Sequence, residues 1–109
     1  MPYDEGLAQR IREALGDLPG LSEKKMFGGM AYVINGNMAC GVIKDELMVR
    51  VGPDGYEKSL SMAHTRRFDF TGKPLRGFIV VTAQGFEDDD ALRKWAMKGV
   101  DFASSLPAK

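Results

Sequence analysis

The sequence has little that would allow covalent cross-linking, metal binding or membrane insertion. Among 109 residues there are one cysteine, one histidine and no long apolar run. A single cysteine excludes an internal disulfide and a cysteine-based zinc cluster, and it fits a reducing, cytoplasmic environment. The first residues lack the apolar core of a secretion signal, and no apolar stretch could span a bilayer, so we expect no contact with a membrane.

Net charge is absent too. Fifteen basic and fifteen acidic side chains give a formal net charge of zero, so no overall field attracts nucleic acid or anionic lipid. No repeat and no linker rich in proline and glycine interrupts the chain, and 44% hydrophobic residues suffice for one core. We therefore expect one domain over residues 1–109.

Helical periodicity is found towards both ends of the chain. The apolar spacing predicts an amphipathic helix over residues 4–18, with Asp4 as N-cap and Pro19-Gly20 as its end. A second helix is predicted from the acidic residues 88–90 to Leu106, because carboxylates favour a helix start. A shorter helical segment is predicted over residues 53–62.

The central part of the chain predicts an antiparallel meander. Asn35-Gly36 between apolar runs is typical of a two-residue hairpin turn, in which both positions need positive φ. This turn would place Val33 opposite Met38, and Ala31 opposite Cys40.

A second two-residue turn is predicted at Asp45-Glu46, which would pair Val42 with Val49 and Cys40 with Val51. Under both turns, one sheet face collects apolar residues: Ala31, Val33, Met38, Cys40, Val42, Leu47, Val49 and Val51.

The opposite face is also unusually apolar, with Met30, Tyr32, Ile34, Ile43 and Met48 alternating with Asn37 and Arg50. A solvated sheet face normally carries more polar residues, so we expect a further element or a partner to cover it. The predicted interaction surface consists of Lys24, Lys25, Met30, Tyr32, Ile34, Met48 and Arg50.

The strand pattern resumes before the last helix. Residues 68–70 predict a strand, residues 71–74 a turn and residues 77–82 a second strand. Helices outside a central set of strands indicate an α+β fold, with helices packed on an antiparallel sheet.

Four residue groups suggest chemistry, and each also has a structural interpretation. Cys40 with His64 as base would make a nucleophile, but a thiol on a core face is more often a buried apolar group. Lys24–Gly29 would suit a phosphate, yet Gly28-Gly29 is more typical of a bend between strands. Asp88–Asp90 would offer metal ligands, although consecutive residues do not converge on one point, and capping explains them.

The most basic stretch, with Arg66, Arg67, Lys73 and Arg76 among phenylalanines, would suit single-stranded nucleic acid if those side chains shared one exposed face. A solvated strand edge is the more common arrangement of such residues. No triad, paired carboxylates or histidine-based metal site is present, and no cofactor is expected.

Residues 24–52, KKMFGGMAYVINGNMACGVIKDELMVRVG, resemble the core signature of the TfoX N-terminal domain family. The resemblance continues through Gly72-Lys73, the acidic helix start at 88–90 and the segment LRKWAMKG at 92–99, in the same order. It implies an α+β domain with helices on an antiparallel sheet. Longer members include TfoX/Sxy regulators of natural competence, which act with a cyclic-AMP receptor protein at promoters.

The sequence ends without the C-terminal helical domain of those longer members, and residues 52–77 are more similar to stand-alone members. Together with the absence of a catalytic constellation, the resemblance implies a non-enzymatic regulatory module that contacts transcription machinery or a cyclic-AMP receptor protein. The apolar second sheet face additionally suggests contact with a second copy of the chain. Two alternatives stay open: a small-ligand or enzymatic pocket near Lys24–Gly29 and Cys40, and direct nucleic-acid binding through the basic stretch.

Overall fold

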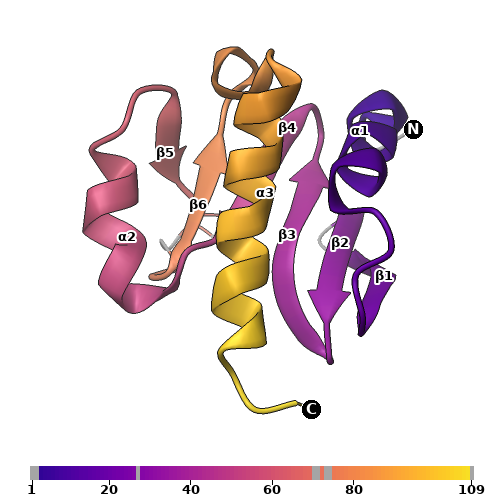
Figure 1. Ribbon diagram of the computed structural model, residues 1–109. Coiled ribbons are helices and arrows are strands. Elements are labelled where there is room, and N and C mark those ends of the chain that lie inside the picture. Colours follow the sequence, from indigo (N-terminus) through magenta and orange to yellow (C-terminus); the bar gives the residue numbers. More distant parts are fainter. Residues whose placement is uncertain (1–2, 27, 70–71, 73–74, 109) are drawn as a thin grey trace.

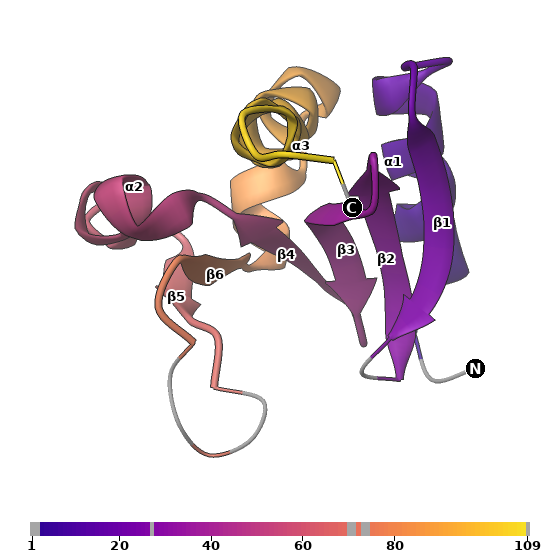
Figure 2. The ribbon, with the colours of Figure 1, turned by 90° about the horizontal axis from the view of Figure 1, so that it is seen from below.

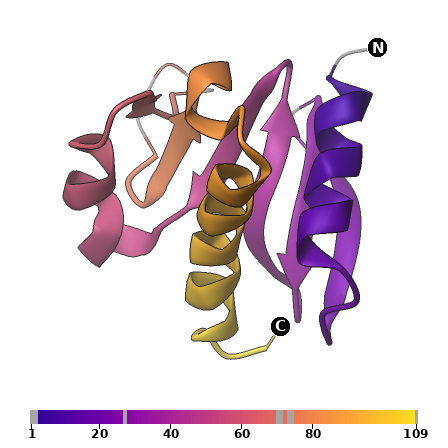
Figure 3. The ribbon, with the colours of Figure 1, turned by 45° about the horizontal axis from the view of Figure 1, so that its top comes forward.

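The chain folds into one antiparallel sheet with helices on one of its faces. The computed structural model describes residues 3–26, 28–69, 72 and 75–108. Six strands lie in the order β1-β2-β3-β4-β6-β5, and α1 and α3 lie side by side on the sheet (Figures 1 and 3). The predicted α+β fold is confirmed. The elements are α1 Glu5–Leu15, β1 Leu21–Met26, β2 Gly29–Ile34, β3 Asn37–Ile43, β4 Glu46–Arg50, α2 Gly52–Leu60, β5 Thr65–Arg67, β6 Phe78–Val81, the 3-10 turn η1 Ala83–Phe86 and α3 Asp89–Ser104.

The first helix begins as predicted and ends early. The Asp4 carboxylate accepts a hydrogen bond from the Leu7 backbone N–H at 3.1 Å, which is the expected N-cap. The helix stops at Leu15 because Gly16 takes a positive φ of 60°, so the predicted end at Pro19-Gly20 is wrong. Leu18 still packs against the core, but from the connection that follows the helix.

The last helix packs very closely on the sheet. Asp88 is its N-cap residue, although the Asp88 side chain makes no capping hydrogen bond. A Cβ on Gly99 would overlap the backbone carbonyl of Ala39 in β3, so glycine permits this close approach. The helix buries Leu92, Trp95, Ala96, Val100 and Ala103 against the sheet, and the predicted end at Leu106 lies beyond the observed end at Ser104.

The hairpin between β2 and β3 contains the predicted turn and an unpredicted bulge. Asn35 and Gly36 both have positive φ, and Val33 lies opposite Met38, as expected. The register then shifts, so that Tyr32 rather than Ala31 lies opposite Cys40. Ala39 is the extra residue, and a bulge of this kind disrupts the alternation of side chains between the two faces.

The bulge exchanges residues between the two predicted faces. The face under α1 and α3, here called the helix face, carries Met30, Tyr32, Ile34, Cys40, Val42, Leu47 and Val49. The other face, here called the open face, carries Ala31, Val33, Met38, Ile43, Met48 and Arg50. Both predicted faces were therefore wrong as sets, because each joined residues from before and after the bulge.

The second turn lies at Lys44-Asp45 rather than at Asp45-Glu46. Val42 pairs with Leu47, and Lys44 has a φ of 55°. The Lys44 carbonyl also accepts a hydrogen bond from the Asp4 N–H at 2.6 Å, which holds the start of the chain against this turn. The predicted register is off by two residues, and a shift of two leaves each side chain on its face.

The strand predicted at residues 68–70 lies earlier, at β5. Phe68 is buried instead on the open face against Met48 and Val80, with Leu75 beside it. Phe70, Thr71, Lys73 and Pro74 lie outside the described residues, while Gly72 has a φ of 85° and donates its N–H to the Asp69 carbonyl. The strand predicted at residues 77–82 is confirmed as β6, and the short helix predicted at residues 53–62 is confirmed as α2, which ends at Leu60, before Met62.

Candidate functional site

The sole cysteine is part of the core. Cys40 is fully buried on the helix face, and burial raises the pKa of its thiol to about 12, so the sulfur is protonated at neutral pH. His64 immediately precedes β5, which lies three strand spacings, about 14 Å, from β3. The hypothesised Cys40–His64 dyad is therefore not formed. No group of three His, Cys, Asp or Glu side chains suitable for a metal occurs among the described residues.

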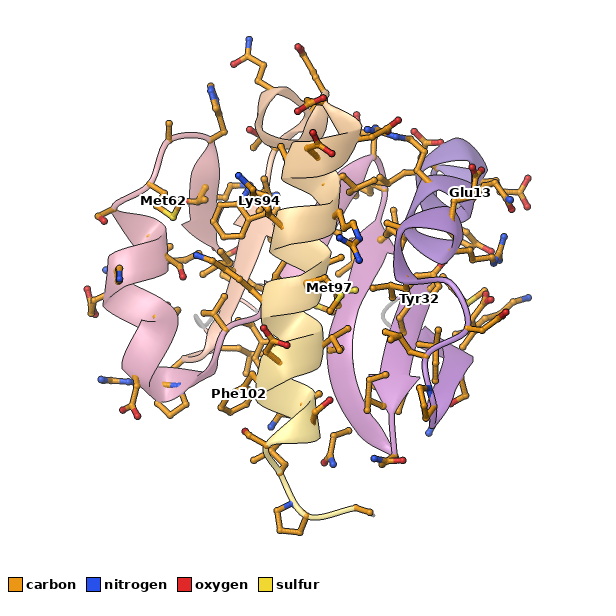
Figure 4. The ribbon with its side chains drawn as sticks, viewed as in Figure 1. Glu13, Tyr32, Met62, Lys94, Met97 and Phe102 are labelled. Atoms are coloured by element: carbon orange, nitrogen blue, oxygen red, sulfur yellow. The ribbon has the colours of Figure 1, made fainter. Side chains whose placement is uncertain are left out.

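The residues predicted to form one interaction surface lie on different faces of the sheet. Tyr32 and Ile34 are buried on the helix face, and the Tyr32 hydroxyl donates a hydrogen bond of 2.9 Å to the Ala8 carbonyl of α1 (Figure 4). Met30 packs against the same core. Tyr32 and Ile34 cannot meet a partner in the folded protein, and Met30 is half-buried on the same side, so the prediction of a shared exposed face is wrong.

Three other residues of the predicted interaction surface, Lys24, Met48 and Arg50, lie on the open face. Met48 is only 2% exposed, because Phe68 and Leu75 pack over it. Lys24 and Arg50 are accessible and belong to this face. Lys25 is exposed as well, but it pairs with Met30 and so belongs to the helix side.

An open depression of about 550 Å³ lies on the open face. This face looks away from α1 and α3 (Figure 2). The residues that line the depression come from β1, β2, β3, β4, β6 and the β2–β3 turn: Ser22, Glu23, Lys24, Met26, Val33, Gly36, Met38, Arg50 and Phe78. Sequence reasoning missed most of them. The bulge at Ala39 places Val33 and Met38 on the face of Met48 and Arg50, and the sequence did not show how β1 and β6 pair with the meander. Lys24 and Met26 line this depression, but the fully buried Cys40 does not, so the depression is not the pocket predicted to join Lys24–Gly29 to Cys40.

The charge of this depression is positive. Its one acidic residue, Glu23, accepts two hydrogen bonds of 2.8 Å from the Arg12 guanidinium of α1. This bidentate contact lowers the pKa of Glu23 and raises the pKa of Arg12, because each charge stabilises the other. Lys24 and Arg50 are not compensated in this way among the described residues.

The segment Lys24–Gly29 forms the β1–β2 hairpin. Met26 pairs with Gly29, and Gly28 takes a φ of 74°, which confirms the interpretation as a bend; Phe27 lies outside the described residues. Because Lys24 and Lys25 point to opposite sides of the strand, they do not converge on one phosphate.

The basic stretch does not form a common face. Arg66 forms an ion pair with Glu46 on the open face, whereas Arg67 pairs with Ile79 and points to the other side of β5. Arg76 is exposed in the connection to β6, and Lys73 lies outside the described residues. The condition for nucleic-acid binding, one shared surface, is not met by Arg66 and Arg67.

The acidic start of α3 has a structural partner. Arg10 of α1 donates hydrogen bonds to the Asp89 carboxylate at 3.0 Å and to the Phe86 carbonyl at 2.7 Å, and it lies over the Phe86 ring. A smaller depression of about 270 Å³ adjoins this contact. Asp89 thus helps to join α1 to α3, and among the described residues no acidic cluster is arranged to hold a metal ion.

Comparisons with known proteins give one match. The sequence profile of the TfoX N-terminal domain matches residues 13–103, which is most of the chain. Neither a search of curated proteins nor a search of solved structures finds a match. None of the helices in the described residues is long and apolar enough to cross a membrane. The extent of the profile match shows that the chain belongs to the TfoX N-terminal domain family.

Proposed function

We propose that this chain is a non-enzymatic regulatory module that binds a protein partner through the open face of its sheet. The observation that carries this proposal is the depression on that face, with half-buried Met26, Met38 and Phe78 flanked by cations. Apolar side chains that remain partly accessible beside charged ones are typical of protein contact surfaces.

The partner we propose belongs to the transcription machinery, with a cyclic-AMP receptor protein as the first candidate. This choice rests on the resemblance to the longer TfoX/Sxy regulators. A shallow, open depression suits a protein surface better than a small metabolite, because small-molecule sites usually enclose most of their ligand. The buried, neutral thiol of Cys40 gives no support to a nucleophilic enzyme.

A pair of methionine substitutions tests this proposal. Met38→Glu places a carboxylate on the open face, whereas Met62→Glu makes the same change at an exposed methionine on the helix side, near Lys98. With a purified cyclic-AMP receptor protein and its cyclic nucleotide, calorimetry should show binding that Met38→Glu weakens at least about tenfold and Met62→Glu leaves unchanged.

Three results would count against it. They are absence of binding to both the receptor protein and RNA polymerase, equal loss in the two variants, and self-association through the open face. In the last case a second copy of the chain occupies the face, and sedimentation would show a dimer that Met38→Glu dissociates.

A further inference from the structure

Arg50 is held in an unusual position at the end of β4. Its guanidinium carbon lies 5.3 Å from the ring centroid of Phe78 on β6 and 5.3 Å from that of Phe102 on α3. Figure 4 shows Phe102 near the C-terminal end of α3, on the side of α2. Arg50 is the last residue of β4, where its side chain can contact both layers. One ring belongs to the sheet and the other to α3, so contacts with two elements restrict the position of the guanidinium group.

The hydrogen-bond donors of Arg50 are unused within the described residues. The ion pairs there involve Arg10, Arg12 and Arg66, each with a carboxylate, and the Arg50 guanidinium takes part in no ion pair or hydrogen bond. A guanidinium carries five N–H donors in one plane. Two aromatic contacts orient that plane without using any donor, so the group is prepared for a planar, bidentate acceptor.

The surroundings of Arg50 indicate which kind of molecule could carry such an acceptor. The depression beside it is lined by apolar Met26, Val33 and Met38, and Lys24 supplies a second cation on β1. Strand spacing and rise place the Cα atoms of Lys24 and Arg50 about 16 Å apart, too far to bind one carboxylate together. An extended peptide covers a comparable distance in four to five residues at roughly 3.3 Å each.

We infer that the open face binds an extended peptide segment with two carboxylates about four residues apart and an apolar side chain between them. Arg50 binds one carboxylate bidentately, Lys24 attracts the other, and the apolar side chain packs on Met38. This inference rests on the proposed function and specifies the chemistry of the partner segment. The charge of the site is complementary to such a segment, since its own acid, Glu23, is already bound to Arg12.

A blocked pentapeptide provides the probe. Acetylated and amidated Glu-Ser-Leu-Ser-Glu places both carboxylates and the leucine on one side of an extended strand, and Gln-Ser-Leu-Ser-Gln is its neutral isostere. Amide chemical shifts of the labelled protein, followed to millimolar peptide, should change saturably around Arg50 and Met38 with the acidic peptide. The neutral peptide should bind at least about tenfold more weakly, because it loses charge-assisted hydrogen bonds.

Adjacent lysines supply a matched control for long-range charge. Lys24→Gln and Lys25→Gln remove the same charge one residue apart, but only Lys24 lies on the open face. We expect Lys24→Gln and Arg50→Gln to weaken the acidic peptide and Lys25→Gln to leave its affinity unchanged. Arg50→Lys keeps the charge and should still lose affinity, because an ammonium cannot bind a carboxylate bidentately.

The outcomes separate the two proposals. Equal affinity for both peptides, equal effects of Lys24→Gln and Lys25→Gln, or no saturable shift would overturn the peptide inference. If Met38→Glu abolishes binding of the receptor protein while Arg50→Gln and Lys24→Gln do not, the proposal that the open face binds a protein is supported. The inference that Arg50 and Lys24 bind carboxylates is then contradicted. If Met38→Glu has no effect on that binding, the open face itself is excluded. Unchanged amide spectra away from the site verify folding of each variant.

Discussion

At the scale of single residues, burial decides which reactive groups remain available. Cys40 has no accessible surface and lies among aliphatic side chains of the helix face. A thiolate there would lose its hydration without gaining a cation, which is why the pKa of the thiol rises to about 12. Reactivity requires a thiolate and access, and this sulfur has neither.

Thiol labelling follows from this environment. In native protein near neutral pH, an aromatic disulfide reagent should react with Cys40 only as fast as the chain opens, so labelling should be slow. The same reagent should label one thiol per chain at once in denaturant, which serves as the control. Rapid stoichiometric labelling of the folded protein, measured by absorbance, would contradict the burial of Cys40.

At the scale of elements, the contact between α3 and β3 depends on two small residues. Gly99 lies over the Ala39 carbonyl, and Ala39 is the bulged residue of β3. The bulge and the glycine together bring the helix close to the sheet. A methyl group at position 99 would have to displace backbone, which a packed core resists.

A pair of glycine substitutions measures this contact. Gly99→Ala should lower the free energy of unfolding by about 1–3 kcal/mol or more, because it overpacks α3 on β3. Gly55→Ala in α2 is the matched control: its Cβ would lie 3.7 Å from the nearest atom, so the better helix propensity of alanine should raise stability by up to about 1 kcal/mol. Urea denaturation gives both values, and equal effects would contradict the close approach at Gly99.

The long helices and the central hairpins could be predicted from the sequence, whereas strand β5 and the two faces of the sheet could not. Capping and turn chemistry are local, and they identified the starts of both long helices and the turn at Asn35-Gly36. In β2 and β3, apolar residues occupy both faces, so alternation carries no information about which side is covered. Nothing in a run such as Met38–Gly41 marks Ala39 as an inserted residue, and that residue determines the lining of the open face.

The arginine site also depends on tertiary structure. Arg50, Phe78 and Phe102 are far apart in the sequence, and they meet through the β4–β6 pairing and the close packing of α3. Neither relation can be derived from local patterns. The sequence analysis grouped Arg50 with Tyr32 and Ile34, which are core residues, and gave no sign of its two aromatic neighbours.

At the scale of the whole molecule, two buried acids link folding to alkaline pH. The pKa of Cys40 is raised to about 12 from an ordinary 9.0, and that of Tyr32 to about 12 from 10.0, in both cases chiefly because burial disfavours the charged form. Above the ordinary values, the unfolded chain loses protons that the folded chain keeps. Deprotonation therefore favours unfolding, and stability falls as pH rises from 9 towards 12.

Chemical denaturation at two pH values measures this link. For Cys40 alone, the expected loss between neutral pH and about pH 10.5 is on the order of 2 kcal/mol, since each pH unit between the two pKa values contributes about 1.4 kcal/mol. Cys40→Ala should be less stable than the parent near neutral pH but should lose less on going to alkaline pH, because only the smaller Tyr32 contribution remains. Comparing the pH-dependent change within each protein cancels the effect of the substitution itself. An equal alkaline loss in both proteins would show that the thiol is not held neutral by the core.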